Sequence, residues 1–234
     1  MTSASADQGT SYGATLTALN HATGSGMLSL TLNGTQATIT EHWAGLAPTF
    51  GGAAYPHVQH IHVGAKGICP TMSADENADG VISTTEGNPS YGGIGTTLSV
   101  SGDTSPAAST NLQIAPAGPS LDYSRTITLS NDVVQSIKSG TAVIVVHGLD
   151  PATLSKKAQG EKSDLVPSLP LAATSPALCG ALSAWPTAPQ TGNGSTAGTE
   201  NLTLFGLGGG LLAAAGAATV LARRRTAVEV DNQR

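Results

Sequence analysis

The sequence of 234 residues has few aromatic and few charged residues. Aromatic side chains make up 3% of the chain and charged side chains 11%, whereas 29 residues are glycine. Small residues together with β-branched Thr and Val favour an all-β domain with many turns over a large helical core. The length is sufficient for one fair-sized domain with appendages or for two small domains.

Positive charge is also scarce. The chain has 10 Lys and Arg against 15 Asp and Glu, for a formal net charge of −5, and three of the basic residues are the cluster Arg223, Arg224 and Arg225. Nucleic acid is therefore excluded as an expected partner, because binding a polyanion requires a basic surface. The sequence also has no recognisable phosphate-binding loop and no Ser/His/Asp order of a hydrolase.

Cysteine occurs only twice, as Cys69 and Cys179, and neither belongs to a Cys-x-x-Cys pair. In an exported protein such a pair can form one disulfide that closes a long loop. The alternative is two unrelated buried thiols. Residues 1–7 lack the basic and apolar regions of a secretory signal, so we expect a signal that was removed or a true start further upstream.

The C-terminal fifth of the chain predicts membrane attachment. Residues 202–222 are uncharged and long enough to span a hydrocarbon core as a helix, and the arginine cluster that follows favours a cytoplasmic C-terminus. Before this segment, a stretch rich in Pro, Gly, Ser and Thr is typical of a flexible linker. The predicted order is a disordered N-terminus (1–11), a β-domain on the outer face of the cell (12–184), a linker (185–201), a transmembrane helix (202–222) and a basic tail (223–234).

Alternation of apolar and polar residues predicts strands throughout the domain, and in 35–43 it places Ala37, Ile39, Glu41 and Trp43 on one face. The near-continuous apolar run 142–146 predicts a strand buried on both faces. Asn33-Gly34 predicts a hairpin turn between two of them. The clearest helix is at 131–138, with Ser130 as its N-cap and Gly140 as its stop. About eight short strands predict a β-sandwich or Greek-key barrel. They are expected at 14–19, 27–32, 35–43, around 58–63, 94–101, 123–129, 141–147 and 177–182, with long polar loops at 69–91 and after 150.

Three of the six histidines, His57, His60 and His62, lie within six residues. In a strand His60 and His62 point to the same face, and two neutral imidazoles on one face can hold Zn, Cu, Fe or Ni. His147 ends the most hydrophobic strand and would supply a third imidazole if the fold brings it close. The alternative is that these are ordinary histidines that donate hydrogen bonds.

Residues 75–86, here called the acidic loop, match the twelve-residue calcium loop of EF-hands. Gly80 occupies the position of the sharp turn. The flanking sequence does not resemble helices, so we expect a calcium-binding loop and not a complete EF-hand. The alternative is an acidic turn with coincidental spacing. The expected ligands are Asp75, Asn77, Asp79, the carbonyl of Val81, Ser83 through a water, and Glu86.

The order of these motifs resembles that of Cu,Zn superoxide dismutases, and the N-terminal part is also similar to CHRD domains. The resemblance covers about residues 12–183. It implies a Greek-key β-sandwich, copper on His60, His62 and His147, a structural role for His57, and a disulfide between Cys69 and Cys179. The motifs are Gly45-Leu46, His57-Val58-Gln59-His60-Ile61-His62, Cys69, Val145-Val146-His147 and Leu178-Cys179-Gly180.

The sequence also departs from the dismutase pattern. No histidine lies between Cys69 and His147, so the residue that would bridge copper to zinc is missing and no zinc site is expected. The arginine that guides superoxide in that family has no counterpart in residues 174–178. Lys156, Lys157 and Lys162 are the nearest basic residues in sequence, although a charged loop is usually only a solvated loop.

A second resemblance concerns the linker. Ala188-Pro189-Gln190-Thr191-Gly192 resembles the sortase signal Leu-Pro-x-Thr-Gly, with Ala188 in place of leucine. It implies cleavage between Thr191 and Gly192 and covalent attachment to the cell wall. Without sortase recognition, the protein is a single-span membrane protein that presents the same domain.

Three hypotheses follow. The first is a surface-anchored metal-binding domain without established catalysis, the second a copper-only superoxide dismutase, and the third a structural or adhesive module. We favour the first, since the missing bridging histidine and arginine argue against the second and the three histidines argue against the third.

Overall fold

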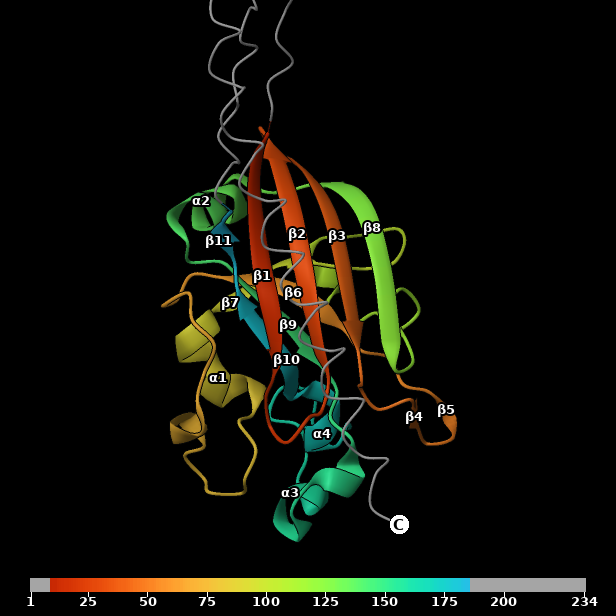
Figure 1. The fold of residues 1–234 in the computed structure, drawn as a ribbon. Coiled ribbons are helices and arrows are strands. Elements are labelled where there is room, and N and C mark those ends of the chain that lie inside the picture. Colours follow the sequence, from red (N-terminus) through yellow and green to blue (C-terminus); the bar gives the residue numbers. More distant parts are fainter. Residues whose placement is uncertain (1–8, 186–234) are drawn as a thin grey trace, which may run out of the picture. The chain divides into compact units, whose positions relative to one another are not determined.

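The computed structural model describes residues 9–185, and strands dominate this part of the chain (Figure 1). The strands are β1 (Thr10–Ala18), β2 (Ser25–Asn33), β3 (Gln36–Ala44), β4 (Thr49–Phe50), β5 (Ala53–Ala54), β6 (Gln59–Val63), β7 (Gly93–Thr97), β8 (Ser120–Thr128), β9 (Val143–His147), β10 (Pro176–Ala181) and β11 (Ser183–Ala184). The α-helices are α1 (Thr84–Tyr91), α2 (Asn131–Ser139), α3 (Lys156–Gly160) and α4 (Leu171–Thr174). Single 3-10 turns occur at Met72–Ala74, Pro106–Ala108 and Pro151–Thr153.

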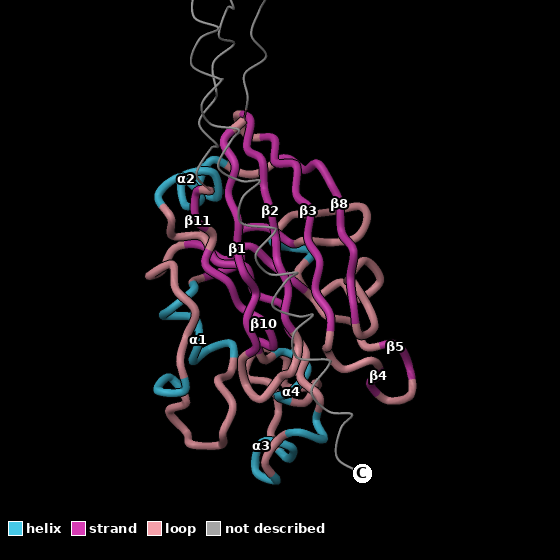
Figure 2. The backbone as a smooth tube through the Cα atoms, viewed as in Figure 1, coloured by secondary structure: helices cyan, strands magenta, loops and turns pink. Residues whose placement is uncertain are grey.

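The large sheet curls over on itself in the order β7-β6-β9-β10-β1-β2-β3-β8. Strand β1 belongs to both halves, because Thr10 to Leu16 pair with β2 whereas Thr17 and Ala18 pair with β10. The first half, β1-β2-β3-β8, lies in front of the second half, β10-β9-β6-β7, in the view of Figures 1 and 2. The predicted all-β, sandwich-like architecture is therefore present.

The core fills the space between the two halves. Strand β3 alternates buried and exposed residues along its whole length, so Ile39 and Trp43 point inward as the sequence predicts. They belong to the same apolar cluster as Ile61 of β6 and Ile144 of β9. All five residues of β9 are buried, which confirms the prediction of a strand covered on both faces.

The predicted helix after β8 is confirmed as α2. The Ser130 hydroxyl accepts a hydrogen bond from the Val133 amide, and Gly140 ends the helix in a left-handed conformation with φ 72°. The turn between β2 and β3 comes one residue later than predicted. Asn33 still pairs with Gln36, so Gly34, at φ 59°, occupies the first turn position.

The prediction that the sequence after the acidic loop is not helical was wrong, because α1 begins within the loop at Thr84 and continues to Tyr91. The signal is a capping box: the Ser83 hydroxyl accepts from the Glu86 amide, and the Glu86 carboxylate accepts from the Ser83 amide. The run Gly87-Asn88-Pro89 is unfavourable for a helix and argued against one, yet these three residues lie within α1. The polar segment after residue 150 also contains unpredicted short helices, α3 and α4.

The ends of the chain are described only in part. Strand β1 begins at Thr10, two residues before the expected start of the domain. Within residues 9–185 no helix is long and apolar enough to cross a membrane. The linker with Thr191 and Gly192, the predicted span 202–222 and the tail 223–234 lie outside the described residues, as does most of the segment 1–11.

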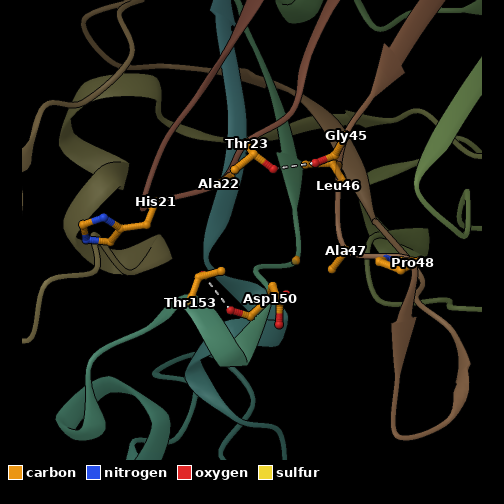
Figure 3. A pocket seen from close by; sticks show the side chains of 10 residues that line it. His21, Ala22, Thr23, Gly45, Leu46, Ala47, Pro48, Asp150 and Thr153 are labelled. Carbon is orange, nitrogen blue, oxygen red and sulfur yellow. Dashed lines mark hydrogen bonds between the residues drawn. The ribbon is translucent and has the colours of Figure 1, made fainter.

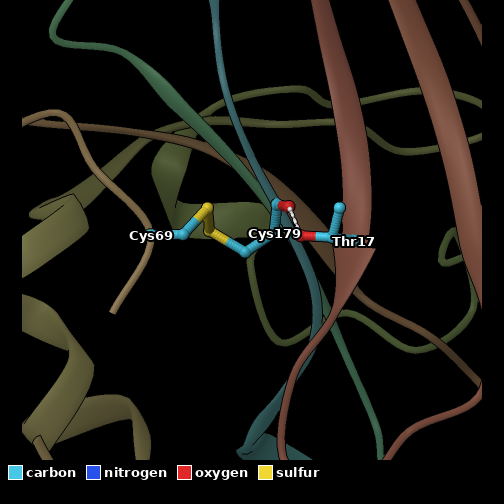
Figure 4. The surroundings of a disulfide bond; sticks show 3 residues. All are labelled: Thr17, Cys69 and Cys179. Carbon is cyan, nitrogen blue, oxygen red and sulfur yellow. Dashed lines mark hydrogen bonds between the residues drawn. A yellow bond between two sulfur atoms is a disulfide. The ribbon is translucent and has the colours of Figure 1, made fainter. Parts of the chain in front are cut away.

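A disulfide joins Cys69, in the loop after β6, to Cys179 of β10 (Figure 4). This is the expected pairing, and it closes a separation of 110 residues. Cys179 is fully buried, and the Thr17 hydroxyl of β1 donates a hydrogen bond of 3.4 Å to its carbonyl. A disulfide of this kind is typical of proteins that fold in an oxidising compartment.

Replacing both cysteines by alanine is expected to lower the free energy of unfolding by about 4 to 5 kcal/mol, because the unfolded chain loses the constraint of a long closed loop. Urea denaturation with and without a reducing agent measures the effect. Reduction should destabilise the wild type by a similar amount and leave the double variant unchanged. Equal stability of the oxidised wild type and the double variant would contradict the expectation.

Strand β3 also buries an acid. Glu41 is 3% exposed, and no described residue gives either carboxyl oxygen a hydrogen bond of good geometry. Burial raises the pKa of Glu41 to about 8, and the neighbouring Gln59 side chain offsets part of this rise. The hydroxyl of the buried Tyr123 is also unpartnered among the described residues. Glu41 is therefore a neutral acid in the folded protein at pH 7.

This acid makes stability fall as the pH rises. Below the ordinary pKa of 4.5 the carboxyl is protonated in both states, whereas between 4.5 and about 8 only the unfolded chain ionises. The loss reaches up to about 5 kcal/mol at pH 8, at 1.36 kcal/mol per pKa unit. Glu41→Gln should therefore become more stable relative to the wild type from pH 4 to pH 8 in urea unfolding. Exposed Glu76→Gln is the control, and a pH-independent difference for Glu41→Gln would refute the assignment.

Candidate metal centre

Pairing between β6 and β9 brings the three histidines together. His60 lies opposite Val145 and His62 opposite Val143, while Ile61 between them points into the core. His147 ends β9, and its amide donates to the Val58 carbonyl just before β6. We call His60, His62 and His147 the histidine cluster. One ring nitrogen of each lies within 4.8 Å of those of the other two, and all three residues are buried.

Backbone carbonyls determine which nitrogen of each ring carries the proton. A carbonyl oxygen only accepts hydrogen bonds, so the nitrogen that it contacts must be protonated. The opposite nitrogens are His60 Nδ1, His62 Nε2 and His147 Nε2, and these are buried without any hydrogen-bond partner among the described residues. The three contacts run from His60 Nε2 to Ser109 O at 3.3 Å, from His62 Nδ1 to Gly92 O at 2.8 Å and from His147 Nδ1 to Thr174 O at 2.7 Å.

Burial favours the neutral form of all three rings. Burial lowers the pKa of His62 to about 3 and that of His147 to about 4. For His60, burial and then the neighbouring histidines hold the pKa well below its ordinary value. The lone pairs are therefore available to a metal ion, which need not displace protons in order to bind.

The donor set fits a transition metal. Among the described residues this is the one group of three or more His, Cys, Asp or Glu side chains with converging ligand atoms, and all its donors are imidazole nitrogens. Three imidazoles suit copper, zinc, iron or nickel and leave a further coordination position open. Each ring is held through its second nitrogen, as is usual for histidines that bind metals.

A small pocket of about 190 Å³ adjoins the histidine cluster. Ile94, Leu165 and Val166 are apolar residues of its wall, and Thr84 and Thr110 also line it. No lysine or arginine is among the described residues that line it. The site is thus reached through largely uncharged surroundings.

His57 lies outside the cluster. Its Nδ1 is 2.9 Å from the His147 carbonyl oxygen and its Nε2 is 2.9 Å from that of Ala47, so both ring nitrogens face backbone carbonyls and not the histidine cluster. The ring connects the segment after β3 to the end of β9, which suits the structural role predicted for it. The adjacent Gly148 has φ 106°, and a Cβ there would lie 2.7 Å from His57 Nδ1, so only glycine fits.

The acidic loop closes on itself around its first three predicted ligands. The Asp75 carboxylate accepts from the amides of Asp79 and Gly80, at 3.2 and 2.9 Å. Asn77 Oδ1 accepts from the Asp79 amide, and Asp79 Oδ1 accepts from the Val81 amide. The carboxylates of the predicted ligands do not converge as the described histidines do.

The last predicted ligand, Glu86, is engaged elsewhere. Its Oε2 accepts from the Ser83 amide as part of the helix cap, and its Oε1 accepts from the amides of Glu76 and Asn77, at 2.9 and 3.4 Å. Glu86 therefore fixes the backbone of the acidic loop from its far end. Ser83, the other late ligand, serves as the N-cap of α1.

The role of Asn20 was not apparent from the sequence. This residue is buried in a left-handed conformation with φ 51°, and its side chain binds both the amide and the carbonyl of Ile82, at 2.7 and 2.8 Å. It also donates to the Pro176 carbonyl at 3.0 Å. Asn20 thus fastens the end of the acidic loop to the turn after β1 and to β10. The sequence indicates this role only in that asparagine adopts a positive φ more readily than most residues do.

A second pocket, of about 200 Å³, lies beside this turn (Figure 3). Its two polar pairs are internal, since the Thr23 hydroxyl donates to the Gly45 carbonyl and the Thr153 hydroxyl donates to the Asp150 carbonyl. His21 is the only histidine among its described lining residues. We assign no chemistry to this pocket.

Comparison with protein-family models finds no match for the chain, and comparison with curated proteins finds none either. The likeness to CHRD domains and Cu,Zn superoxide dismutases therefore rests on the order of the motifs. The curled sheet, the Cys69–Cys179 disulfide and the histidine cluster accompany it.

Asn20→Ala should lower the free energy of unfolding by about 2 to 4 kcal/mol, because it leaves buried backbone groups of Ile82 and Pro176 without partners. Urea denaturation measures the loss, with exposed Asn33→Ala as the control. A loss below about 0.5 kcal/mol, smaller than one net hydrogen bond, would show that Asn20 does not hold the acidic loop.

Proposed function

We propose that the protein is an exported, surface-anchored metal-binding domain of the CHRD or superoxide dismutase type, with one copper ion on the histidine cluster. The observation that supports this proposal is that one ring nitrogen of each of three buried histidines lies within 4.8 Å of those of the other two, and that a backbone carbonyl holds each ring. The Greek-key topology, the span at 202–222 and attachment through Thr191 and Gly192 belong to the same proposal.

Copper is favoured over other metals by the donor set together with the motif order. Three imidazoles match a trigonal copper(I) site, and copper(II) accepts a further ligand at the open position. Zinc fits three imidazoles as well, so metal identity is part of the test. When bound, copper would supply one-electron redox chemistry. The chain itself orients the rings and, through burial, keeps water largely away from them.

Superoxide dismutation is the second candidate, and the surroundings of the cluster weigh against it. An anionic substrate is attracted by positive potential around a cleft. The described pocket walls carry no basic residue, and the Lys157 ammonium donates to the Asn77 carbonyl in the acidic loop. A structural module with ordinary histidines is the third candidate, which the unpartnered nitrogens disfavour.

Metal content tests the proposal. The purified chain is stripped of metal, offered copper and zinc together, dialysed and analysed for both elements. His60→Ala/His147→Ala is compared with His42→Ala, an exposed histidine 2.7 Å from Asp122 on the outer face of the sheet. We expect one copper per chain in the wild type and in His42→Ala, and none in the double variant, because two of its three donors are gone.

A superoxide assay on the same samples separates the candidate functions. Copper without dismutation supports the binding function, whereas fast dismutation that is lost in the double variant establishes the enzyme. A wild type that retains no copper would contradict both.

A further inference from the structure

The acidic loop faces an acid that its own sequence does not contain. Glu161 follows α3, about eighty residues further along the chain, and lies against Asp79 and Asn77. The carboxylates of Asp79 and Glu161 carry like charges. Two carboxylates that only accept hydrogen bonds repel each other unless they share a proton or a cation.

Asp79 is the buried member of this pair. It is 3% exposed, and its Oδ1 accepts from the Val81 amide, whereas its Oδ2 is buried without a hydrogen-bond partner among the described residues. A buried carboxylate oxygen without a partner is rare in folded proteins, and a bound cation would satisfy such an atom. Here the unpartnered atom belongs to a residue that the loop pattern designates as a ligand.

Other contacts bring the two segments together at this point. The Ser155 hydroxyl, at the start of α3, donates to the Asp79 carbonyl at 2.7 Å, and Lys157 donates to the Asn77 carbonyl. The side-chain Nδ2 of Asn77 lies 3.5 Å from the Glu161 carboxylate and donates to it. The positive charge of Lys157 also acts on Glu161. The Lys157 ammonium itself donates to a backbone oxygen and not to a carboxylate.

We infer that Asp79 and Glu161 hold one calcium ion between the acidic loop and the end of α3. Calcium accepts six to eight oxygen ligands in irregular geometry, which suits carboxylates from two loops. Glu161 takes the place that an EF-hand gives to its twelfth residue, because Glu86 caps α1. The ion would connect two segments that are otherwise joined mainly by single hydrogen bonds.

Calcium titration of the purified full chain, followed by calorimetry and by the melting temperature, tests this inference. We expect one calcium per chain in the wild type and at least tenfold weaker binding in Glu161→Gln. Glu161→Gln should also melt higher than the wild type without calcium, because the like-charge contact is removed, yet gain little when calcium is added. A purely structural role for Glu161 would not produce this reversal.

A matched variant separates a calcium ligand from a general effect of charge. Glu76→Gln removes one negative charge from the same acidic loop and should bind calcium as the wild type does. A wild type that does not bind calcium, or binding that is weakened as much in Glu76→Gln as in Glu161→Gln, would overturn the inference. The copper measurements on the histidine variants are independent of this result.

Discussion

Both ring nitrogens of a buried imidazole need a hydrogen-bond partner or a metal ion, and the centre of the domain depends on this requirement. Pairing of β6 with β9 brings His60 and His62 beside His147 in a region from which water is largely excluded. Backbone carbonyls accept one N–H from each ring, so the other nitrogen of each ring is left without a partner among the described residues. Without a ligand these nitrogens stay unpaired at a cost of about 1 to 3 kcal/mol each. A single metal ion on the histidine cluster, as proposed, would give each of these nitrogens a partner.

The three carbonyls belong to three separate connections between strands. The backbone of these connections therefore determines which nitrogen of each histidine carries the proton. Gly92 follows α1, Ser109 follows a 3-10 turn, and Thr174 ends α4. The Thr174 carbonyl also accepts from the Thr84 hydroxyl of α1 at 2.6 Å, which links two of these connections directly. Asn20 and the disulfide fasten the same region to β1 and β10. A small sheet domain with few aromatic residues thus holds its site through polar contacts and one covalent bond.

Local patterns predicted much of the framework. The period of two in β3 predicted its buried face, the run at 141–147 predicted a strand covered on both sides, and the spacing of His60 and His62 placed both rings on one face. The motif order indicated His147 and the cysteine pairing. These features depend on residues close in sequence or on a resemblance that spans the domain.

The remaining features depend on contacts between distant segments, and no local pattern encodes them. Helix α1 was missed because a capping box competes with a Gly-Asn-Pro run, and only the packed structure decides between them. Glu161 meets Asp79 through the arrangement of two loops, and Gly148 is required by the ring of His57. The tautomers of the histidine cluster depend on backbone carbonyls in three loops. Every residue has such a carbonyl, so the identity of the loop residues does not indicate these hydrogen bonds.

The most direct test of the central claim is the tautomeric state of the three histidines, read from long-range proton–nitrogen NMR correlations on the metal-free protein at pH 7. The carbonyl contacts of the three rings predict a proton on Nε2 of His60 and on Nδ1 of His62 and His147, with all three rings neutral. Adding one equivalent of copper should then affect the signals of the three unprotonated nitrogens first. An imidazolium at any of the three positions, or the opposite tautomer at one of them, would contradict the convergence of lone pairs that defines the proposed metal site.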